Sequence, residues 1–286
     1  MESKIILGTV QFGLNYGINN PEGKPPEEEV FKILDLAGKF GIQEIDTADG
    51  YGSAVRVLGR YFKEYPGAFK VMSKFSRNNK KTFLELFSES LERLCLSRLE
   101  GYYFHSFSDF VNFDEFDQVH LLKKSGKLNS LAVSLYTDDE LEIAATHPEV
   151  DVIQMPFNLL DRGPRKIKLL EKAKSLNKKI YARSVFLQGL FFMSVSRLPV
   201  KLHSLKNTLS DVQQLASRNK MSMQELCLNY VLHKNFIDKV VIGIDSTFQL
   251  NENMNSIHGS FPGGLEKEIE KMVVKDLNLL NPSHWS

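Results

Sequence analysis

The sequence has few cysteines, no long apolar run and almost no net charge, and each shortage excludes a class of protein. Only Cys95 and Cys227 occur, far apart, so we expect neither a disulfide framework nor a cysteine-based metal site. No apolar segment approaches the ~20 residues of a membrane helix, and the N-terminus lacks the apolar core of a signal peptide. The 36 Lys and Arg against 35 Asp and Glu leave a net charge of +1, too small to attract nucleic acid or an anionic membrane. We therefore expect a soluble, cytoplasmic protein that binds neither.

What remains is the composition of a globular protein. Of the 286 residues, 42% are hydrophobic and 25% are charged, which is near the average for folded domains. The length alone allows one large domain or two small ones. Because no linker-like segment rich in proline, glycine or serine interrupts the chain, we expect a single domain over residues 1–286.

Short apolar and β-branched segments alternate with longer amphipathic ones along the chain, which is typical of βα units on a parallel sheet. The expected strands are residues 5–8, 43–47, 70–74, 101–105, 130–135, 152–155, 179–184 and 239–243. Eight such units predict an α/β fold, the (β/α)8 or TIM barrel. An open doubly wound sheet is the alternative. Such a sheet would usually carry Gly-x-Gly-x-x-Gly after a strand, and the spacing of Gly8 and Gly13 does not match that motif.

Helix-start signals lie between the expected strands. The Pro-Pro-Glu-Glu-Glu segment at 25–29 places proline and then acids in a first helical turn, where the helix dipole favours them. Thr137 with Glu140, and Ser246 with Gln249, have the spacing of a capping box. These signals predict the starts of three helices.

Four protonatable side chains lie at the ends of the second, third and fourth expected strands: Asp46, Tyr51, Lys74 and His105. In a barrel, the carboxyl ends of all strands meet at one rim. A tyrosine with a pKa near 10 is a weak acid at neutral pH, and an ammonium group beside it favours the phenolate. A carboxylate keeps that ammonium charged, and a histidine can bind a substrate oxygen or relay a proton. The four residues therefore predict a site in which Tyr51 is a general acid tuned by Lys74 and Asp46.

Each of these residues also has a structural explanation. Asp46 could cap a turn, Tyr51 before a glycine could belong to one, and His105 could be buried under a loop. Lys74 could be a solvated charge at the rim or the Schiff-base lysine of an aldolase. Their coincidence at neighbouring strand ends favours the catalytic interpretation.

The motifs around these residues resemble those of the aldo-keto reductases, in kind and in order, over nearly the whole chain. They are Gly8-Thr9-x-Gln11-Phe12-Gly13, Ile45-Asp46-Thr47-Ala48-x-x-Tyr51-Gly52, Ser73-Lys74-Phe75, Ser90-Leu91-x-Arg93-Leu94, Tyr103-Phe104-His105, Ala132-Val133-Ser134, Gln154-x-Pro156-x-Asn158-Leu159-Leu160-Asp161 and Gly243 to Asn253. The resemblance implies a (β/α)8 barrel that binds a nicotinamide dinucleotide without a Rossmann fold and reduces aldehydes or ketones. It also implies that Tyr51 is the general acid, Lys74 and Asp46 its tuning pair, and His105 the residue that orients the carbonyl.

The same resemblance implies where the dinucleotide would lie. We expect the nicotinamide carboxamide at Ser134 and Gln154, the nicotinamide and pyrophosphate beside residues 183–189, and the adenosine end at the helix that starts after Ser246. The expected cofactor-binding residues are Gly8, Thr9, Ser134, Gln154, Ser184, Phe186, Gln188, Gly189, Gly243, Ser246, Gln249 and Asn253.

Two features depart from the family pattern. Leu135 stands where many members have an asparagine that also binds the carboxamide. No lysine or arginine occurs between Gly243 and Asn253, where many members have an arginine that pairs with the 2′-phosphate of NADP. Asp245 and Glu252 add negative charge to the same segment, so the usual charge-assisted contact is missing. The expected cofactor is NADP(H), with NAD(H) possible.

The expected substrate is a small carbonyl compound, such as a sugar aldehyde, in a pocket lined by Tyr16, Phe107 and Phe186. The histidines are scattered, with no nearby acid cluster, and no metal site is expected. We expect a monomer or a weak homo-oligomer. The alternative function is that of a catalytically weak, dinucleotide-binding regulatory protein of the same fold.

Overall fold

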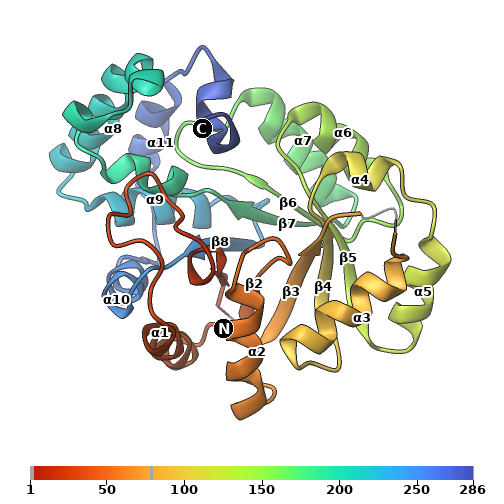
Figure 1. The fold of residues 1–286 in the computed structure, drawn as a ribbon. Coiled ribbons are helices and arrows are strands. Elements are labelled where there is room, and N and C mark those ends of the chain that lie inside the picture. The colour runs from red at the N-terminus through yellow and green to blue at the C-terminus, as the bar shows by residue number, and fades with distance from the viewer. Residues whose placement is uncertain (1–2, 78–79, 286) are drawn as a thin grey trace.

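Eight parallel strands close into a barrel in which every strand pairs with its sequence neighbours and β8 pairs with β1 (Figure 1). The structure, a computed structural model, describes residues 3–77 and 80–285, so the first two residues of the N-terminal segment lie outside it. The strands are β1 (Ile5–Gly8), β2 (Glu44–Asp46), β3 (Lys70–Phe75), β4 (Leu99–Phe104), β5 (Leu128–Ser134), β6 (Val152–Pro156), β7 (Lys179–Arg183) and β8 (Lys239–Gly243). The expected (β/α)8 barrel is confirmed, and closure excludes the open sheet.

The strand bounds differ slightly from the expected ones. Only β1 and β8 match, and the other strands begin or end one or two residues away. A strand extends as far as its neighbours pair with it, which a local apolar pattern does not show. Leu99, for example, belongs to β4 because it pairs with Leu128 of β5. β4 ends at Phe104, so His105 is the first residue after the strand.

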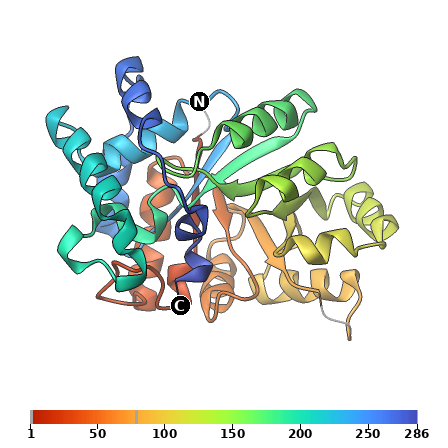
Figure 2. The same ribbon diagram turned by 90° about the horizontal axis from the view of Figure 1, so that it is seen from above.

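Helices cover the outside of the barrel (Figures 1 and 2). They are α1 (Glu27–Lys39), α2 (Ala54–Glu64), α3 (Phe83–Leu94), α4 (Phe107–Val111), α5 (Phe116–Lys124), α6 (Asp138–Thr146), α7 (Pro164–Ser175), α8 (Lys206–Arg218), α9 (Met223–Leu232), α10 (Thr247–Asn255) and α11 (Gly263–Glu270). Short 3₁₀ helices lie at Val10–Phe12, Leu187–Phe192, Val195–Arg197, Val200–Leu205, Leu277–Leu280 and Pro282–His284. In Figure 2 the segment after α11, in dark blue, runs across the molecule.

The three predicted helix starts are present, with one difference in detail. α1 starts after Pro26 and has three glutamates in its first turn. Thr137 and Glu140 form the expected capping box of α6. Ser246 accepts the backbone N–H of Gln249, but the Gln249 side chain accepts the N–H of Asp245 instead of completing a box. Two capping boxes were not predicted, Thr82 with Glu85 and Ser222 with Glu225.

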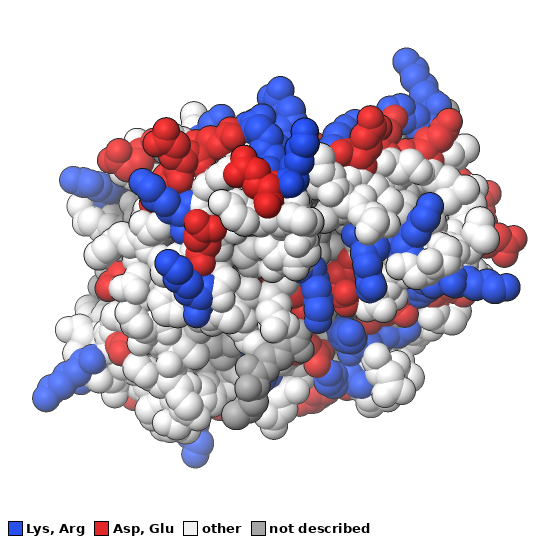
Figure 3. Space-filling model, turned by 90° about the horizontal axis from the view of Figure 1, so that it is seen from below, with Lys and Arg blue, Asp and Glu red and all other residues white. Residues whose placement is uncertain are grey.

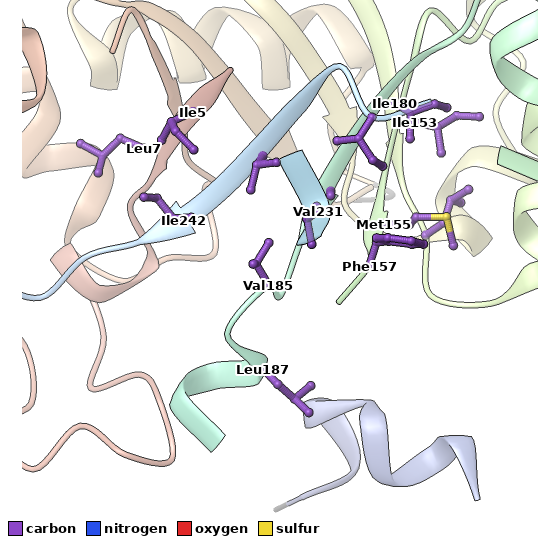
Figure 4. Packing of buried hydrophobic residues seen from close by; sticks show 14 of the residues in the cluster. Ile5, Leu7, Ile153, Met155, Phe157, Ile180, Val185, Leu187, Val231 and Ile242 are labelled. Carbon is purple, nitrogen blue, oxygen red and sulfur yellow. The ribbon is translucent and has the colours of Figure 1, made fainter. Parts of the chain in front are cut away.

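Two clusters of buried side chains hold the barrel together. The interior is filled by Ile6, Met72, Tyr103, Ala132, Val152 and Tyr181, so the barrel is a packed core and not a pore. A larger cluster lies between the strands and the helices. Figure 4 shows part of it, with Leu7 of β1, Ile153 of β6 and Ile180 of β7.

The alternation of side chains along each strand connects this core to the mouth of the barrel. Residues two positions apart on a strand point to the same side of the sheet. Met72 of β3 is in the interior cluster, and Lys74 follows it at the carboxyl end. Tyr181 of β7 is likewise followed by Arg183. The packing of the interior therefore directs Lys74 and Arg183 toward the space above it.

None of the helices in the described residues combines the length and the apolar character that crossing a bilayer requires. On the face shown in Figure 3, basic and acidic side chains are mixed, and neither sign forms a continuous patch there.

Two helical glycines, one tightly packed and one not, allow a test of the contact between α2 and α3. An alanine Cβ at Gly59 of α2 would lie 2.2 Å from the backbone oxygen of Arg93 in α3, whereas at Gly38 of α1 nothing lies within 4 Å. Helix propensity alone favours alanine at both positions by about 1 kcal/mol. We expect Gly59→Ala to lower the free energy of unfolding by about 1–3 kcal/mol, because the two helix backbones must separate.

Gly38→Ala, the matched control, should be neutral or stabilise by up to about 1 kcal/mol. Urea unfolding followed by circular dichroism measures both changes. Equal effects of the two substitutions would contradict the close α2–α3 contact.

Candidate active site

A cavity of about 490 Å³ opens at the carboxyl ends of the strands. Its walls come from the loops after β1 and β7 and from the start of α10. Most residues expected at the site line this cavity: Gly8, Thr9, Tyr16, Asp46, Tyr51, Lys74, His105, Ser134, Gln154, Ser184, Phe186, Gln188, Gly189, Gly243, Gln249 and Asn253. The fold therefore brings together side chains that lie more than 200 residues apart.

Two expected residues do not line the cavity. Phe107 was expected in the substrate pocket, but α4 starts at this residue, and its ring packs near Phe110, 6.0 Å away, against the outer core. Ser246 was expected to touch the cofactor, but its hydroxyl instead accepts the N–H of Gln249 at the start of α10. Both lie at helix starts, α4 and α10, and neither is among the residues that line the cavity.

An ion pair between Lys74 and Asp46 lies at the floor of the cavity. The Lys74 ammonium donates to one carboxylate oxygen of Asp46, and both side chains are almost completely buried. The second oxygen of Asp46 accepts a hydrogen bond of 2.8 Å from the Gln154 amide. Burial lowers the pKa of Lys74, and the Asp46 carboxylate opposes this shift. The pair is therefore held in a fixed position by β2, β3 and β6.

Tyr51 lies above this pair, in the turn that leads into α2. The Lys74 nitrogen is 5.3 Å from the centre of the Tyr51 ring. Burial raises the pKa of Tyr51 above its usual value, the Asp46 carboxylate raises it further, and the charge of Arg183 lowers it. The pKa of Tyr51 is therefore raised and not lowered as expected, because the sequence pattern does not show how deeply the phenol is buried. Tyr51 keeps its proton at neutral pH in this structure.

His105, the first residue after β4, lies against the Tyr51 ring. The two rings are perpendicular, with centres 5.9 Å apart and an interplanar angle of 80°. Burial, and then the nearby Lys74 charge, lower the pKa of His105 to about 4. The imidazole is therefore neutral at physiological pH, and its ring N–H can donate a hydrogen bond to a ligand oxygen.

The remaining wall offers unsatisfied polar groups and tight backbone turns. The Gln154 side-chain oxygen is buried without a partner in the described residues, and Ser134 beside it is 4% exposed. After β7, Ser184, Leu187 and Gln188 all have positive φ angles between 48° and 59°, which is costly for residues other than glycine. The free oxygen of Gln154 and the nearby Ser134 hydroxyl could together bind a carboxamide, because a carboxamide both donates and accepts hydrogen bonds.

The α10 end of the cavity carries negative charge. Asp245 and Glu252 line it, and Lys74 and Arg183 are the only lysine or arginine among the described lining residues. Both cations extend from the strand ends. Burial raises the pKa of Asp245, whose carboxylate accepts hydrogen bonds from Gln249 and Asn20.

The cavity lining also includes two side chains to which no role was assigned, Tyr136 and Arg183. Arg183 lies at the start of the segment expected to pack against the nicotinamide, but its side chain was not assigned to the site. Its position two residues after Tyr181 could have indicated that it faces the mouth of the barrel. Among the described residues, no group of three or more His, Cys, Asp or Glu side chains could hold a metal ion.

The sequence model of the aldo/keto reductase family matches residues 4–272. The chain belongs to the aldo/keto reductase family. Its members are NAD(P)-dependent oxidoreductases, and the identification made from the motifs is confirmed.

Two curated aldo-keto reductases are similar to this chain. Aldo-keto reductase YhdN of Bacillus subtilis is 26% identical over 175 residues, which are 56% of this chain and 51% of that protein. Aldo-keto reductase str7 of Strobilurus tenacellus is 28% identical over 176 residues, 57% of this chain and 52% of that protein. The aligned part of this aldo/keto reductase thus spans about half the length of each relative.

Among solved structures, a putative aldo-keto reductase from Pseudomonas aeruginosa has a similar fold. It superposes with a TM-score of 0.66 at 21% identity, covering 89% of both chains. This likeness concerns the fold alone.

The low pKa of His105 predicts a pH effect on stability. The folded protein holds this histidine neutral down to about pH 4, whereas the unfolded chain binds a proton near pH 6.5. Unfolding therefore takes up a proton between these values, and stability falls as the pH is lowered through this window. We expect His105 to account for a loss on the order of 2–3 kcal/mol between pH 7.5 and pH 4.5.

In the His105→Gln variant of this aldo/keto reductase, that part of the pH dependence should disappear. Urea unfolding of both proteins at the two pH values measures it. If the stability of variant and wild type changed equally with pH, folding would not lower the pKa of His105, which would contradict the prediction.

Proposed function

We propose that this aldo/keto reductase reduces the carbonyl group of a small aldehyde or ketone with NAD(P)H. The proposal rests chiefly on one arrangement, the buried Asp46–Lys74 pair with Tyr51 and His105 above it at the floor of a cavity. A proton-holding phenol beside a buried cation suits the protonation of an oxygen on which negative charge develops.

The nicotinamide cofactor, when bound, supplies the hydride for this reaction. Ser134 and the free oxygen of Gln154 would hold its carboxamide, and the loop at 184–189 with Gly243 would form the wall along it. Gln249 and Asn253 would face its adenosine half. The unpartnered Gln154 oxygen supports this assignment.

The four side chains at the floor of the cavity have different roles in the reaction. Neutral His105 donates a hydrogen bond to the carbonyl oxygen and holds it near Tyr51. Tyr51 gives its proton to that oxygen as it becomes negative. The Lys74 ammonium then stabilises the phenolate left on Tyr51, and Asp46 keeps Lys74 charged and oriented. Aromatic residues around the cavity exclude water from these groups.

The central test is the removal of the Tyr51 hydroxyl. We expect Tyr51→Phe to lower kcat for carbonyl reduction by about 10²- to 10⁴-fold, because the proton donor is lost. The dissociation constant of the dinucleotide should change less than about threefold, because the Tyr51 hydroxyl is not among the groups proposed to hold it. Oxidation of NADH or NADPH over a panel of aldehydes and ketones measures turnover, and nicotinamide fluorescence measures binding.

Tyr65→Phe is the matched control, since Tyr65 is 48% exposed at the end of α2 and away from the cavity. Near-wild-type turnover of Tyr51→Phe would reject Tyr51 as the acid. Tight dinucleotide binding by the wild type, with no turnover of any carbonyl, would instead favour the regulatory, dinucleotide-binding function.

The acidic α10 end supports a preference for NAD(H) over NADP(H). The 2′-phosphate of NADP(H) would add negative charge near Asp245 and Glu252, with no lysine or arginine among the described lining residues at that end. We propose NAD(H) as the preferred cofactor, in a cytoplasmic enzyme that is a monomer or a weak homo-oligomer.

This preference predicts a smaller dissociation constant for NADH than for NADPH. Gln249→Arg should lower the ratio of the NADPH to the NADH dissociation constant by about tenfold, because a guanidinium can pair with the 2′-phosphate. Gln214→Arg, on the exposed side of α8, adds the same charge away from the cavity and should leave the ratio unchanged. Tighter binding of NADPH than NADH by the wild type would contradict the proposal.

A further inference from the structure

Arg183 is a cation in the cavity without an acidic partner. It ends β7, and its side chain reaches across β6 to the end of β5, where it donates a 3.0 Å hydrogen bond to the backbone oxygen of Leu135. Its guanidinium carbon lies 4.2 Å from the centre of the Tyr136 ring. Other arginines of the protein, such as Arg60 and Arg165, pair with carboxylates. Arg183 makes no ion pair with any Asp or Glu in the described residues.

The hydrogen-bonding capacity of Arg183 is only partly used. A guanidinium has five N–H donors and cannot lose its charge in a protein. One terminal nitrogen donates to Leu135 and the other donates to the Ser184 hydroxyl at 3.3 Å. The Nε atom is buried without a partner. An unpaired, half-buried cation of this kind costs free energy unless a ligand pairs with it.

Arg183 also lies close to the groups proposed for the reaction. Its positive charge lowers the pKa of Tyr51 and of Tyr16 and further lowers that of His105. All of these residues line the same cavity. Because Lys74 is paired with Asp46, Arg183 is the cation without a carboxylate partner among the described residues that line the cavity.

The position of Arg183 favours a substrate group over a dinucleotide phosphate. The guanidinium lies over Tyr136, which lines the cavity and is 40% exposed. The α10 end, where the adenosine half is expected, carries Asp245 and Glu252 instead. Arg183 thus lies at the part of the cavity where its charge acts on Tyr51 and His105, and the α10 end carries the acidic residues instead.

We propose that Arg183 binds a carboxylate on the substrate, so that the preferred substrates are aldehydes or ketones that carry a negative charge. This assignment rests on the proposed carbonyl reduction and adds the substrate class to it. A guanidinium recognises a planar carboxylate with two parallel hydrogen bonds, and the stacking on Tyr136 fixes its plane. Arg183 is then the residue that determines specificity, while Tyr51 and His105 act on the carbonyl.

A matched pair of aldehydes tests the proposal. 4-Carboxybenzaldehyde and its methyl ester, methyl 4-formylbenzoate, share the ring and the carbonyl and differ in charge. We expect wild-type kcat/KM to be at least about tenfold higher for the acid than for the ester. Arg183→Gln should reduce this preference by about 10- to 100-fold.

Arg183→Lys should keep part of the preference, since it keeps the charge and loses the planar fork. Arg197→Gln, which removes an exposed arginine that does not line the cavity, should keep all of it. Equal kcat/KM for acid and ester in the wild type, or a preference that survives Arg183→Gln, would overturn the proposal. The wild-type comparison needs no variant, so it decides the question even if a variant fails to fold.

A binding measurement separates this proposal from the reductase activity itself. The alcohol 4-(hydroxymethyl)benzoate carries the carboxylate and has no carbonyl to reduce. Calorimetric titration should show that it binds the wild type and Arg197→Gln about 10- to 100-fold more tightly than Arg183→Gln. If it does so while no aldehyde is reduced, Arg183 binds anions and the proposed function fails.

If both aldehydes are reduced equally well and the benzoate does not bind, the reductase function stands and the anionic substrate class is wrong. A final measurement is the dissociation constant of NADH for Arg183→Gln, compared with that for the wild type. A loss of NADH affinity as large as the loss of activity on the acid would show that Arg183 binds the dinucleotide, which also overturns the proposal.

Discussion

The buried ion pair between Lys74 and Asp46 is the contact on which the rest of the site depends. A lysine with almost no exposed surface is stable only beside a carboxylate, and Asp46 is held in turn by Gln154. These three side chains come from β3, β2 and β6, so the pair joins separate parts of the closed barrel. Tyr51 packs against Lys74, and His105 packs against Tyr51. Removal of either charge would leave its partner buried and uncompensated, so this pair constrains both folding and chemistry.

The barrel explains why this pair can be both buried and near a ligand. Along each strand, one residue fills the interior and the residue two positions later faces the mouth, as Met72 and Lys74 show. The hydrophobic interior excludes water from below, and the cavity admits a ligand from above. Water therefore screens the charges of Lys74 and Asp46 only weakly. Arg183, without an acidic neighbour, acts in the same environment.

Much of the fold and of the site could be predicted from the sequence because both depend on local patterns. The apolar segments located the eight strands, and the polar residues at their ends located Asp46, Tyr51, Lys74 and His105. Phe107 and Ser246 lie at the starts of α4 and α10 and do not line the cavity. Which residues of a loop line a cavity depends on how the loop folds, which residue spacing does not show.

Two properties of the site depend on burial and on contacts between distant segments. The sequence suggested that Lys74 would lower the pKa of Tyr51, but burial of the phenol raises it. Arg183 was not assigned to the site because its Tyr136 and Leu135 contacts come from a different strand end. Neither property follows from the spacing of residues along the chain.

The turn after β7 has a consequence for how the loops at the cavity can move. Its strained backbone is held by the loop after β1, since Ile18 donates to the Gln188 carbonyl and the Gln188 amide donates to the Tyr16 hydroxyl. These two bonds fasten opposite walls of the cavity to each other. A movement that separated the two loops would have to break both bonds, and it would free the turn to relax toward commoner backbone angles. The two loops at the cavity are therefore coupled, so that a shift of one is resisted by its contacts with the other.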